Sequence, residues 1–167
     1  MLTDPRAESA RGIDLDGDLA AHVIVTARRT ALGVLGDREA AADVAQEVAL
    51  EAFRQRRSLR DPGALDGWIH RVAVRVALRE ARRSRRRRAA EDARASIDVP
   101  LPHGSVDRTL TALDGLPPRQ RAALTLRYAH DLPDAAIARA LRCRPATVRS
   151  LLMRGREAVR ARMEEEA

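Results

Sequence analysis

The sequence predicts an all-α protein made of two small helical domains. Apolar residues recur at spacings of three and four along most of the chain, which places them on one face of a helix in each segment. The 167 residues suffice for one ordinary domain or two small ones. Periodicity is lost over residues 89–104, where two prolines and a glycine lie, and this break predicts a flexible linker. The predicted domains span residues 18–88 and 105–163.

Three helices are predicted for the first domain. Residues 1–17 are polar and are expected to form a loosely attached lead without a function. From Asp18 the apolar residues cover a wide arc, which predicts a largely buried helix that ends at Gly36. Asp37 is placed to cap the next helix, because its carboxylate can accept from the free N–H groups of the first turn. Residues 58–63 are predicted to form the turn before the third helix.

The second helix, from 38 to about 57, has two contrasting faces. Small apolar residues suited to close helix packing form one face: Ala41, Val44, Ala45, Val48 and Ala52. Acids and an amide form the other: Asp43, Gln46, Glu47 and Glu51. Because such groups would hinder DNA binding if they faced DNA, we interpret them as facing a basic protein surface. An ordinary solvated face is the alternative.

The third helix, 65–88, combines a core face with a basic stripe. The core face consists of Leu65, Trp68, Ile69, Val72 and Val76. Five arginines fall within a sector of roughly 80° on another side: Arg71, Arg75, Arg79, Arg82 and Arg86. From Arg71 to Arg88 the only acid is Glu80, so the arginines repel each other unless an anion is supplied. We therefore predict a polyanion partner, whose phosphates match the planar guanidinium fork, although a solvated face is the alternative.

The second domain contains a helix-turn-helix pattern. A helix is predicted from Pro118 to Tyr128, followed by a short helix that Asp134 caps. A tight connection at 142–144 leads to a second helix with Pro145 in its first turn. In this motif the second helix enters the major groove. Candidate DNA contacts are Arg144, Thr147, Arg149, Ser150 and Arg154. The alternative is an ordinary helical bundle, in which two consecutive helices joined by a tight turn show the same pattern.

Composition narrows the function class. All 31 basic residues are arginine and the net charge is +7, which favours an anionic partner. The single cysteine, Cys143, excludes an internal disulfide and leaves too few thiolates for a cysteine-based zinc site, so we predict neither a metal nor a cofactor. The N-terminus has no signal-peptide pattern and no segment approaches a membrane span, which predicts a cytoplasmic protein that does not contact a membrane.

An enzyme is the least favoured class. The four histidines stand singly in the sequence, at His22, His70, His103 and His130. No set of nucleophile, base and orienting residue is evident among them or elsewhere. We therefore predict a binding protein with no catalytic residues.

Four stretches resemble a known family. They are DVAQEVALEAF (Asp43–Phe53), WIHRVAVRVAL (Trp68–Leu78), LDGLPPRQRAALTLRY (Leu113–Tyr128) and IARALRCRPATVRSLLMRGREAVR (Ile137–Arg160). Their order and spacing are similar to regions two and four of the extracytoplasmic-function group of bacterial sigma factors.

The resemblance implies a role for each surface. Asp43, Gln46 and Glu47 would dock on a coiled coil in the clamp of core RNA polymerase. The arginine-rich helix after Trp68 would meet the minus-ten element of promoter DNA and help to melt it, and the recognition helix would read the minus-thirty-five element. Members of the family have no enzymatic activity of their own. Many are held inactive by an anti-sigma factor, which is a further partner that the resemblance allows.

Two alternatives remain open at this point. A sigma-like protein-binding module could have lost promoter recognition and titrate an anti-sigma factor or another regulator. Ala136, Arg144 and Leu151 depart from the family pattern and support this alternative. Leu151 either contacts a thymine methyl group, packs into the core or meets a protein partner. An ordinary helix-turn-helix repressor would explain the second domain alone.

Overall fold

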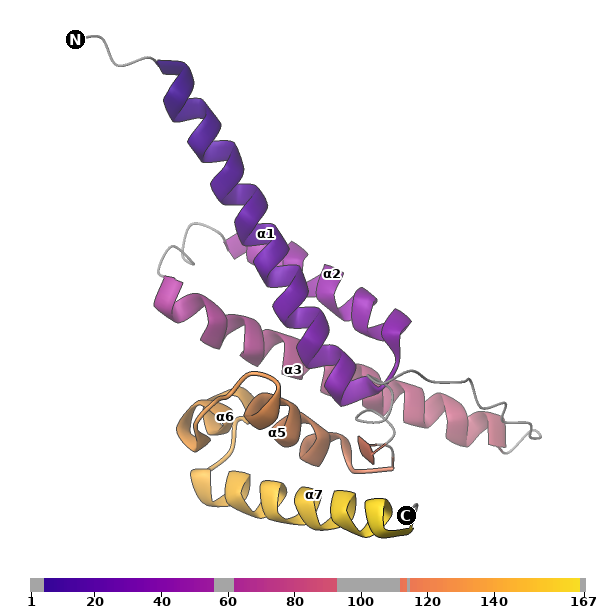
Figure 1. Ribbon diagram of the computed structural model, residues 1–167. Coiled ribbons are helices and arrows are strands. Elements are labelled where there is room, and N and C mark those ends of the chain that lie inside the picture. The colour runs from indigo at the N-terminus through magenta and orange to yellow at the C-terminus, as the bar shows by residue number, and fades with distance from the viewer. Residues whose placement is uncertain (1–4, 56–61, 93–111, 114, 166–167) are drawn as a thin grey trace.

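In the computed structural model, residues 5–55, 62–92, 112–113 and 115–165 are described, and the regular secondary structure of these ranges is helical (Figure 1). The N-terminal bundle consists of α1 (Pro5–Leu35), α2 (Arg38–Gln55) and α3 (Pro62–Asp92). The C-terminal unit consists of α5 (Pro118–Tyr128), α6 (Asp134–Leu141) and α7 (Pro145–Glu165). The prediction of an all-α fold with two helical units is confirmed.

The N-terminal bundle is closed by contacts between each pair of its helices. The core faces predicted for α2 and α3 are all buried: Ala41, Val44, Ala45, Val48, Ala52, Leu65, Trp68, Ile69, Val72 and Val76. On α1 the buried residues include Val23, Ala27, Ala31 and Val34, at helical spacing. The many alanines let the helix backbones approach closely, so the bundle forms a dense core with a single tryptophan.

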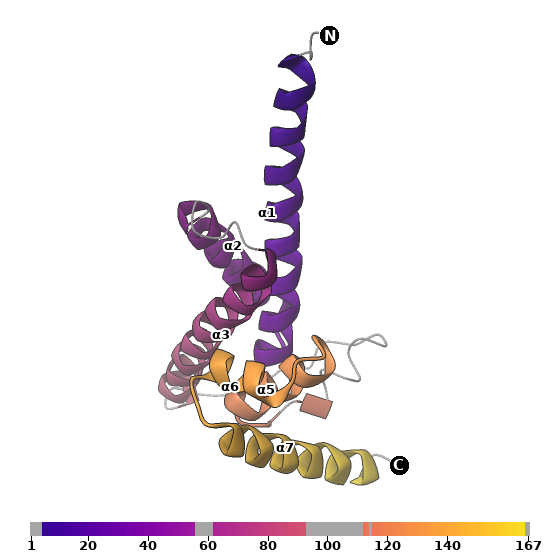
Figure 2. The same cartoon turned by 90° about the vertical axis from the view of Figure 1, so that its left-hand side faces the viewer.

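Helix α1 differs from its prediction in two ways. It begins at Pro5 rather than Asp18, so residues 5–17 of the predicted lead belong to the helix, and residues 1–4 lie outside the described residues. Proline suits the first helical turn, and the alanine, glutamate and arginine residues that follow favour helix. The N-terminal half of α1 extends beyond the other helices (Figure 2). The prediction of a largely buried helix is also wrong, because Ile24 and Val25 are 41% and 65% exposed.

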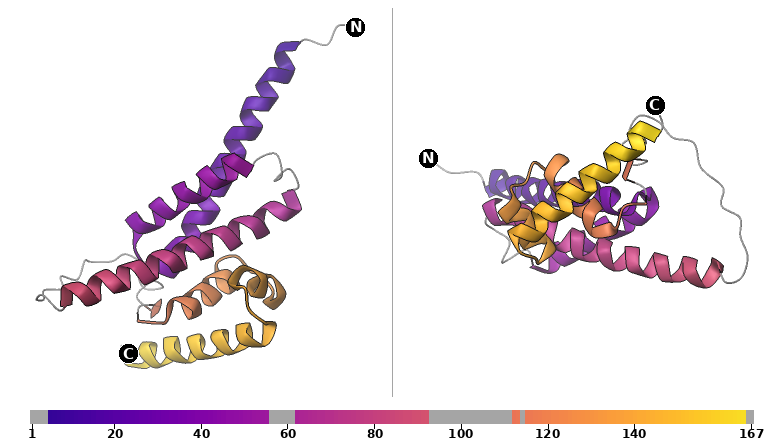
Figure 3. Two further views of the ribbon diagram at one scale, coloured as in Figure 1. Left: turned by 180° about the vertical axis from the view of Figure 1, so that it is seen from behind. Right: turned by 90° about the horizontal axis from the view of Figure 1, so that it is seen from below.

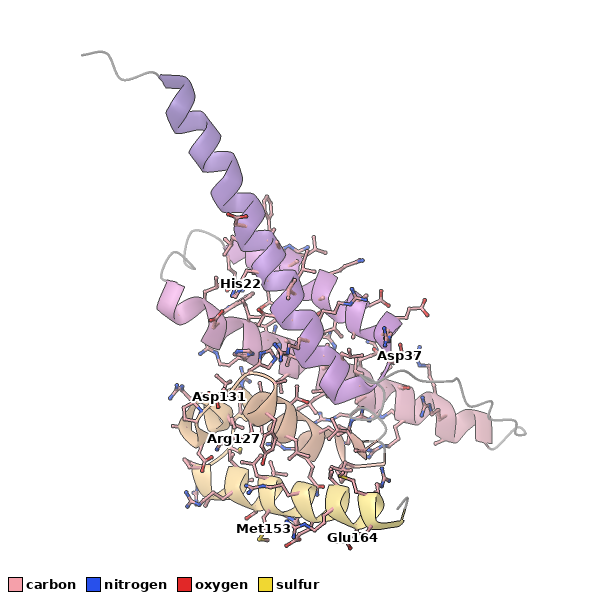
Figure 4. The ribbon with its side chains drawn as sticks, in the orientation of Figure 1. His22, Asp37, Arg127, Asp131, Met153 and Glu164 are labelled. Atoms are coloured by element: carbon pink, nitrogen blue, oxygen red, sulfur yellow. The ribbon has the colours of Figure 1, made fainter. Side chains whose placement is uncertain are left out.

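The connection between α1 and α2 is as predicted. Gly36 adopts a φ of 73°, in the left-handed region that glycine tolerates, and its N–H donates to the carbonyl of Leu32 at 2.8 Å. Asp37 then caps α2, because its Oδ1 accepts from the backbone N–H groups of Glu39 and Ala40, both at 2.9 Å. Figure 4 shows Asp37 at this turn.

Helix α3 is longer than expected at both ends. It begins at Pro62, so the end of the predicted turn at 58–63 is helical, and the first part of that turn lies outside the described residues. It ends at Asp92, which brings the first residues of the predicted linker at 89–104 into the helix. Two alanines and a glutamate favour this extension. The rest of the linker lies outside the described residues.

The helix-turn-helix geometry is confirmed with one correction. Arg142 ends α6 in the left-handed conformation, with φ 49° and ψ 56°, and α7 begins at Pro145. The prediction that Asp134 caps α6 is wrong, since Pro133 occupies the cap position and makes no side-chain hydrogen bond. The Asp134 carboxylate instead accepts from the Arg127 guanidinium, which ties α6 to the end of α5.

The two units pack directly on each other. Their buried residues form one continuous hydrophobic cluster, in which α5 contacts α1 and α3, and α6 contacts α3 (Figure 3). Helix α3 therefore has a second buried face, centred roughly 130° around the helix from the predicted core face. The residues of this face are His70, Ala73, Val74 and Ala77. The sequence pattern did not predict this second buried face.

The contact between α1 and α5 leaves no spare room. Arg121 donates from Nε to the carbonyl oxygen of Gly33 at 3.3 Å. A Cβ atom added at Gly33 would lie 2.1 Å from Oγ1 and 2.5 Å from Cγ2 of Thr125. Next to it, Thr30 Oγ1 and His130 Nε2 lie 2.9 Å apart. Glycine at position 33 is therefore required by the close approach of α5.

Three histidines gather at this junction. His22 Nε2 lies 2.6 Å from Asp66 Oδ1 (Figure 4 labels His22 on α1), and the rings of His70 and His130 meet edge to face with centroids 4.4 Å apart. The interpretation of the histidines as isolated is therefore wrong for these three, because their proximity depends on the packing of α1, α3 and the end of α5. His103 lies outside the described residues. Within the described chain, no group of three potential ligands could hold a metal ion.

Replacing Gly33 with alanine tests the contact between α1 and α5, because the contact determines whether the free energy of unfolding rises or falls. In an exposed helix, Gly→Ala stabilises by about 1 kcal/mol. At the tightly packed interface, Gly33→Ala should instead destabilise the protein by about 1–3 kcal/mol through overpacking against Thr125. Urea unfolding measures the free energy, and small-angle scattering measures the separation of the two units.

Gly17→Ala is the matched control, because it lies on the same helix and nothing lies within 4 Å of its added Cβ. It should be neutral or stabilising. Thr125→Ala removes both of the closest atoms and should restore most of the stability in the double variant with Gly33→Ala. A stabilising Gly33→Ala variant would show that α5 does not pack against α1 in solution.

Candidate polymerase and nucleic-acid interfaces

The outer face of α2 combines acids, an amide and large apolar side chains. Asp43, Gln46 and Glu47 are all exposed. Leu50 and Phe53 follow at helical spacing on the same side and are 59% and 64% exposed. We refer to these five residues as the α2 surface. Helix α2 thus buries its alanine and valine face in the bundle and presents the α2 surface to solvent.

This composition suits a protein partner rather than nucleic acid. Exposed leucine and phenylalanine side chains lose unfavourable contact with water when a partner covers them. The neighbouring carboxylates would repel phosphate and can pair with basic residues on a protein. Leu50 and Phe53 were not among the residues predicted to contact a partner. The sequence does indicate them, because they continue the three-and-four spacing that begins at Asp43 along α2.

Five arginines of helix α3 share one exposed side. Arg71, Arg75, Arg79, Arg82 and Arg86 are all exposed, as the spacing predicted. We refer to these five residues as the α3 stripe. The core face and the second buried face of α3 fix the rotation of the helix, so the stripe is held in one direction.

Two members of the α3 stripe pair with acids of α2. Arg79 Nη2 donates to both carboxylate oxygens of Glu47, at 2.6 and 2.7 Å, and Arg75 Nη2 donates to Glu51 Oε2 at 2.7 Å. The prediction that these arginines repel each other until an external anion arrives is therefore wrong for this pair of residues. The acids come from a neighbouring helix, which local sequence does not reveal.

These ion pairs are weak enough to exchange. Each side chain of the Arg79–Glu47 pair is about half exposed, at 52% and 46%, so water and salt screen the attraction. Pairs of this kind contribute about 0–1 kcal/mol. Within the described residues, Arg71, Arg82 and Arg86 make no ion pair. The stripe can therefore engage phosphate directly at these three positions and by exchange at the other two.

The recognition helix α7 separates a core face from an outer face. Arg144, Thr147, Arg149 and Arg154 are exposed and Ser150 is partly exposed. The inner face contains Val148, Leu151, Leu152 and Gly155, all buried. Leu151 is only 8% exposed, so it packs into the core, and the alternatives of a thymine contact or a partner contact are excluded in this structure. Leu151 therefore no longer supports the alternative of a protein-binding module that has lost promoter recognition.

Side-chain hydrogen bonds order the outer face of α7. Ser150 Oγ donates to the carbonyl of Ala146 at 3.2 Å, and Arg154 Nε donates to the carbonyl of Ser150 at 3.3 Å. Ser150 and Arg154 are thus partly engaged with their own helix. Thr147 and Arg149 lie nearer its N-terminus, where side chains of a recognition helix reach base edges.

A depression of about 540 Å³ adjoins the recognition helix. It is lined by Arg127, Tyr128, Asp134, Arg149, Leu152, Met153 and Arg156. Tyr128 and Met153 are 64% and 54% exposed, and Met153 lies on the side of α7 away from the N-terminal bundle (Figure 4). No local pattern in the sequence predicts this surface, because its parts come from α5, α6 and α7.

Comparison with known proteins gives the family. Residues 19–87 match the model of Sigma-70 region 2, and residues 107–159 match the model of Sigma-70, region 4. The chain is 34% identical over 142 residues to ECF RNA polymerase sigma factor SigE of Mycolicibacterium smegmatis, covering 79% of this chain and 55% of the relative. It is 32% identical over 140 residues to RNA polymerase sigma-H factor of Pseudomonas aeruginosa, covering 74% and 72%. The chain belongs to the extracytoplasmic-function (ECF) sigma factors.

A solved structure shows the same fold over both units. The sigma factor RpoE of Bartonella quintana, in complex with the anti-sigma factor NepR, superposes with a TM-score of 0.72 at 20% identity, covering 90% of this chain and 97% of that chain. ECF sigma factors are non-enzymatic subunits that bind core RNA polymerase and promoter DNA, so the predicted function class is confirmed at the level of the family. In the described helices, none is long and apolar enough to cross a membrane.

Neutralising Glu47 should release Arg79 for DNA. Glu47→Gln removes the charge that pairs with this arginine, so binding of a duplex of arbitrary sequence should strengthen at low salt. One additional phosphate contact should steepen the slope of log K against log salt by about 0.9. Fluorescence anisotropy over a salt series measures the slope.

Glu39→Gln changes the net charge of the protein equally, at an exposed position in the first turn of the same helix. Its salt slope should remain that of the wild type. Equal slopes for the two variants would mean that only net charge matters and that the Glu47–Arg79 pair does not limit DNA binding.

Proposed function

We propose that this chain binds core RNA polymerase through the α2 surface and directs it to promoters with separate minus-ten and minus-thirty-five elements. The observation that carries the proposal is the separation of three surfaces of different chemistry on one chain. The α2 surface is acidic and apolar, whereas the α3 stripe and the outer face of α7 are rich in arginine. Protein and DNA can therefore bind at the same time.

The site residues follow from this division. Asp43, Gln46 and Glu47 contact the polymerase, and we add Leu50 and Phe53 because they are exposed beside them. The minus-ten element meets the α3 stripe. The minus-thirty-five element meets Arg144, Thr147, Arg149, Ser150 and Arg154, of which Thr147 and Arg149 are placed to reach base edges.

Affinity and specificity come from different residues. Phosphate contacts of the α3 stripe supply affinity that falls steeply with salt. Base contacts near the start of α7 supply preference for sequence. We propose that 18–88 and 105–163 are the functional domains and that 89–104 links them, in keeping with the two family matches. We also propose that the protein acts in the cytoplasm, where polymerase and promoters are found.

Binding both promoter elements requires the two units to separate. The elements lie about 25 base pairs apart, which is roughly 85 Å along the duplex at about 3.4 Å per base pair. In the structure the two units share one hydrophobic cluster, with the rings of His70 and His130 only 4.4 Å apart. The structure therefore represents a closed form, and the polymerase-bound form must be open.

Run-off transcription tests the function. Core polymerase from a GC-rich bacterium, a pool of promoter fragments and this protein as the only specificity subunit should yield discrete transcripts with shared upstream elements. Arg149→Ala should lower discrimination at one base pair of the upstream element by about 1–3 kcal/mol, because a base contact is lost.

Arg160→Ala is the matched control, since Arg160 is exposed on α7 but lies farther along the helix than the recognition residues. Its promoter preference should be unchanged. Absence of transcripts with several core enzymes, while a known sigma factor is active in the same reactions, would count against the proposal. Equal selectivity of Arg149→Ala and the wild type would remove Arg149 from the site.

A second proposal concerns the depression beside α7. Tyr128 and Met153 supply exposed apolar surface, and Arg149 and Arg156 supply positive charge at its edge. This combination fits an acidic amphipathic helix of a protein partner. Because Arg149 belongs to both surfaces, such a partner would block the minus-thirty-five contact. The RpoE neighbour is bound to an anti-sigma factor, so we propose an inhibitor of that class as the occupant.

A photo-crosslinking amino acid at position 128 would identify the occupant in bacterial cells. The crosslinked protein, once purified, should inhibit run-off transcription by the wild type at least tenfold more strongly than transcription by the double variant Tyr128→Ala, Met153→Ala. The double variant must retain promoter-dependent transcription, which shows that it is folded. Crosslinks to polymerase subunits alone, or equal inhibition of both proteins, would exclude an anti-sigma site in the depression.

A further inference from the structure

The junction between the two units buries ionisable groups that the proposed function does not use. His70 is 4% exposed, on the second buried face of α3, and it meets the half-buried ring of His130, which follows α5. Thr30 of α1 is fully buried beside His130. These three residues, His70, His130 and Thr30, form what we call the histidine junction. Each unit contributes one histidine to it.

The hydrogen bonds at the junction define the protonation state of His130. Thr30 Oγ1 donates its hydrogen to the carbonyl of Thr26 at 2.9 Å, so it is left to accept from Nε2–H of His130. A neutral His130 then carries its proton on Nε2, and Nδ1 is free to take up a second proton. His70 Nδ1 is buried and has no hydrogen-bond partner within the described residues. The closed form therefore holds two neutral imidazoles.

The charged surroundings oppose a second proton more than they favour it. Burial, together with the smaller effects of His70 and Arg29 of α1, lowers the pKa of His130 to about 4, whereas Asp66 acts in the opposite direction. Burial also lowers the pKa of His70, with Asp66 opposing and His22 of α1 assisting. Asp66 is the one acid in this set, and it already pairs with His22.

We propose that the histidine junction is a proton-sensitive closure of this sigma factor, which holds the two units together while both imidazoles are neutral and releases them when either becomes charged. A single imidazolium at this buried position would lose its hydration, and two in edge contact would also repel each other. Separation of the units hydrates both rings.

Linkage gives the direction and size of the effect. In the open form His130 should titrate near 6.5, its ordinary value, whereas in the closed form its pKa is about 4. Because the open form binds the proton more tightly, the contribution of His130 to closure is fully present above pH 6.5 and is lost as the pH falls towards 4. One such histidine weakens the closure equilibrium about tenfold per pH unit in this window, and His70 adds to the slope.

This inference rests on the proposed function in one respect. If the open form is the one that spans both promoter elements, acidification would increase the fraction of protein that is competent for transcription. The closure itself can be measured without polymerase or DNA, so it is tested separately.

The test uses two fluorophores on the full chain. Cys143, in the connection between α6 and α7, accepts one label, and Glu39→Cys, at the exposed start of α2, accepts the other. Energy transfer should be high at pH 7.5 and should fall between pH 6.5 and 4.5. His130→Gln keeps an N–H donor for Thr30 but cannot be protonated, so it should shift the midpoint of opening at least half a pH unit lower. His70→Phe keeps a ring without a charge and should act in the same direction.

Controls separate opening from unfolding. His22→Gln removes an exposed histidine outside the ring contact and should retain the pH-dependent opening. Gly33→Ala should give low energy transfer at every pH and so defines the open signal. Circular dichroism must show unchanged helix content over the titration. The proposal is overturned if wild type stays closed down to pH 4.5, or if the double variant His70→Phe, His130→Gln opens with the wild-type midpoint.

Discussion

The packing of α5 against α1 determines the arrangement of the whole molecule. Gly33 allows the side chain of Thr125 to occupy the space that a Cβ would take, and Arg121 donates to the carbonyl of Gly33 beside it. This contact places the C-terminal unit under α3, so α3 becomes buried on two sides. Along the part of α3 that is buried on two sides, Arg71 and Arg75 of the α3 stripe lie on the remaining exposed side. The direction of the stripe and the burial of His70 therefore both depend on this single approach.

The surfaces assigned to polymerase and to DNA are coupled by charge. Glu47 belongs to the α2 surface, yet its carboxylate binds Arg79 of the α3 stripe. A polymerase residue that pairs with Glu47 would release Arg79 for phosphate, and the reverse also holds. The coupling energy is limited to about 1 kcal/mol because both side chains are half exposed. If the proposed site residues act as assigned, docking on polymerase would have a direct electrostatic effect on DNA binding.

In the C-terminal unit, the surface that packs on the N-terminal bundle differs from the surface that carries the recognition residues. Helices α5 and α6 pack on the N-terminal bundle, whereas the main contacts of α7 among the described helices are with α5 and α6. The recognition residues of α7 thus stay accessible in the closed form. The proposed closure would therefore limit the distance between the two proposed DNA-binding surfaces rather than cover them, and an inhibitor in the depression beside Arg149 would act by a second route.

The sequence by itself determined the helices and their local chemistry. Spacing predicted the buried faces of α2 and α3, Gly36 and Asp37 predicted one connection, and Pro145 predicted the start of the recognition helix. These features depend on residues within one or two helical turns. The four family-like stretches also predicted the division of labour between the α2 surface, the α3 stripe and α7.

Tertiary structure alone decided which helix faces meet. The second buried face of α3, the pairing of Glu47 with Arg79 and the contact of His70 with His130 join residues far apart in the chain. Their side chains look like ordinary surface or isolated residues in the sequence, because periodicity shows that a face is apolar or charged but not what lies opposite it. Leu151 illustrates the same limit. Its burial depends on how closely α7 approaches α5, which is a property of packing and not of the local pattern.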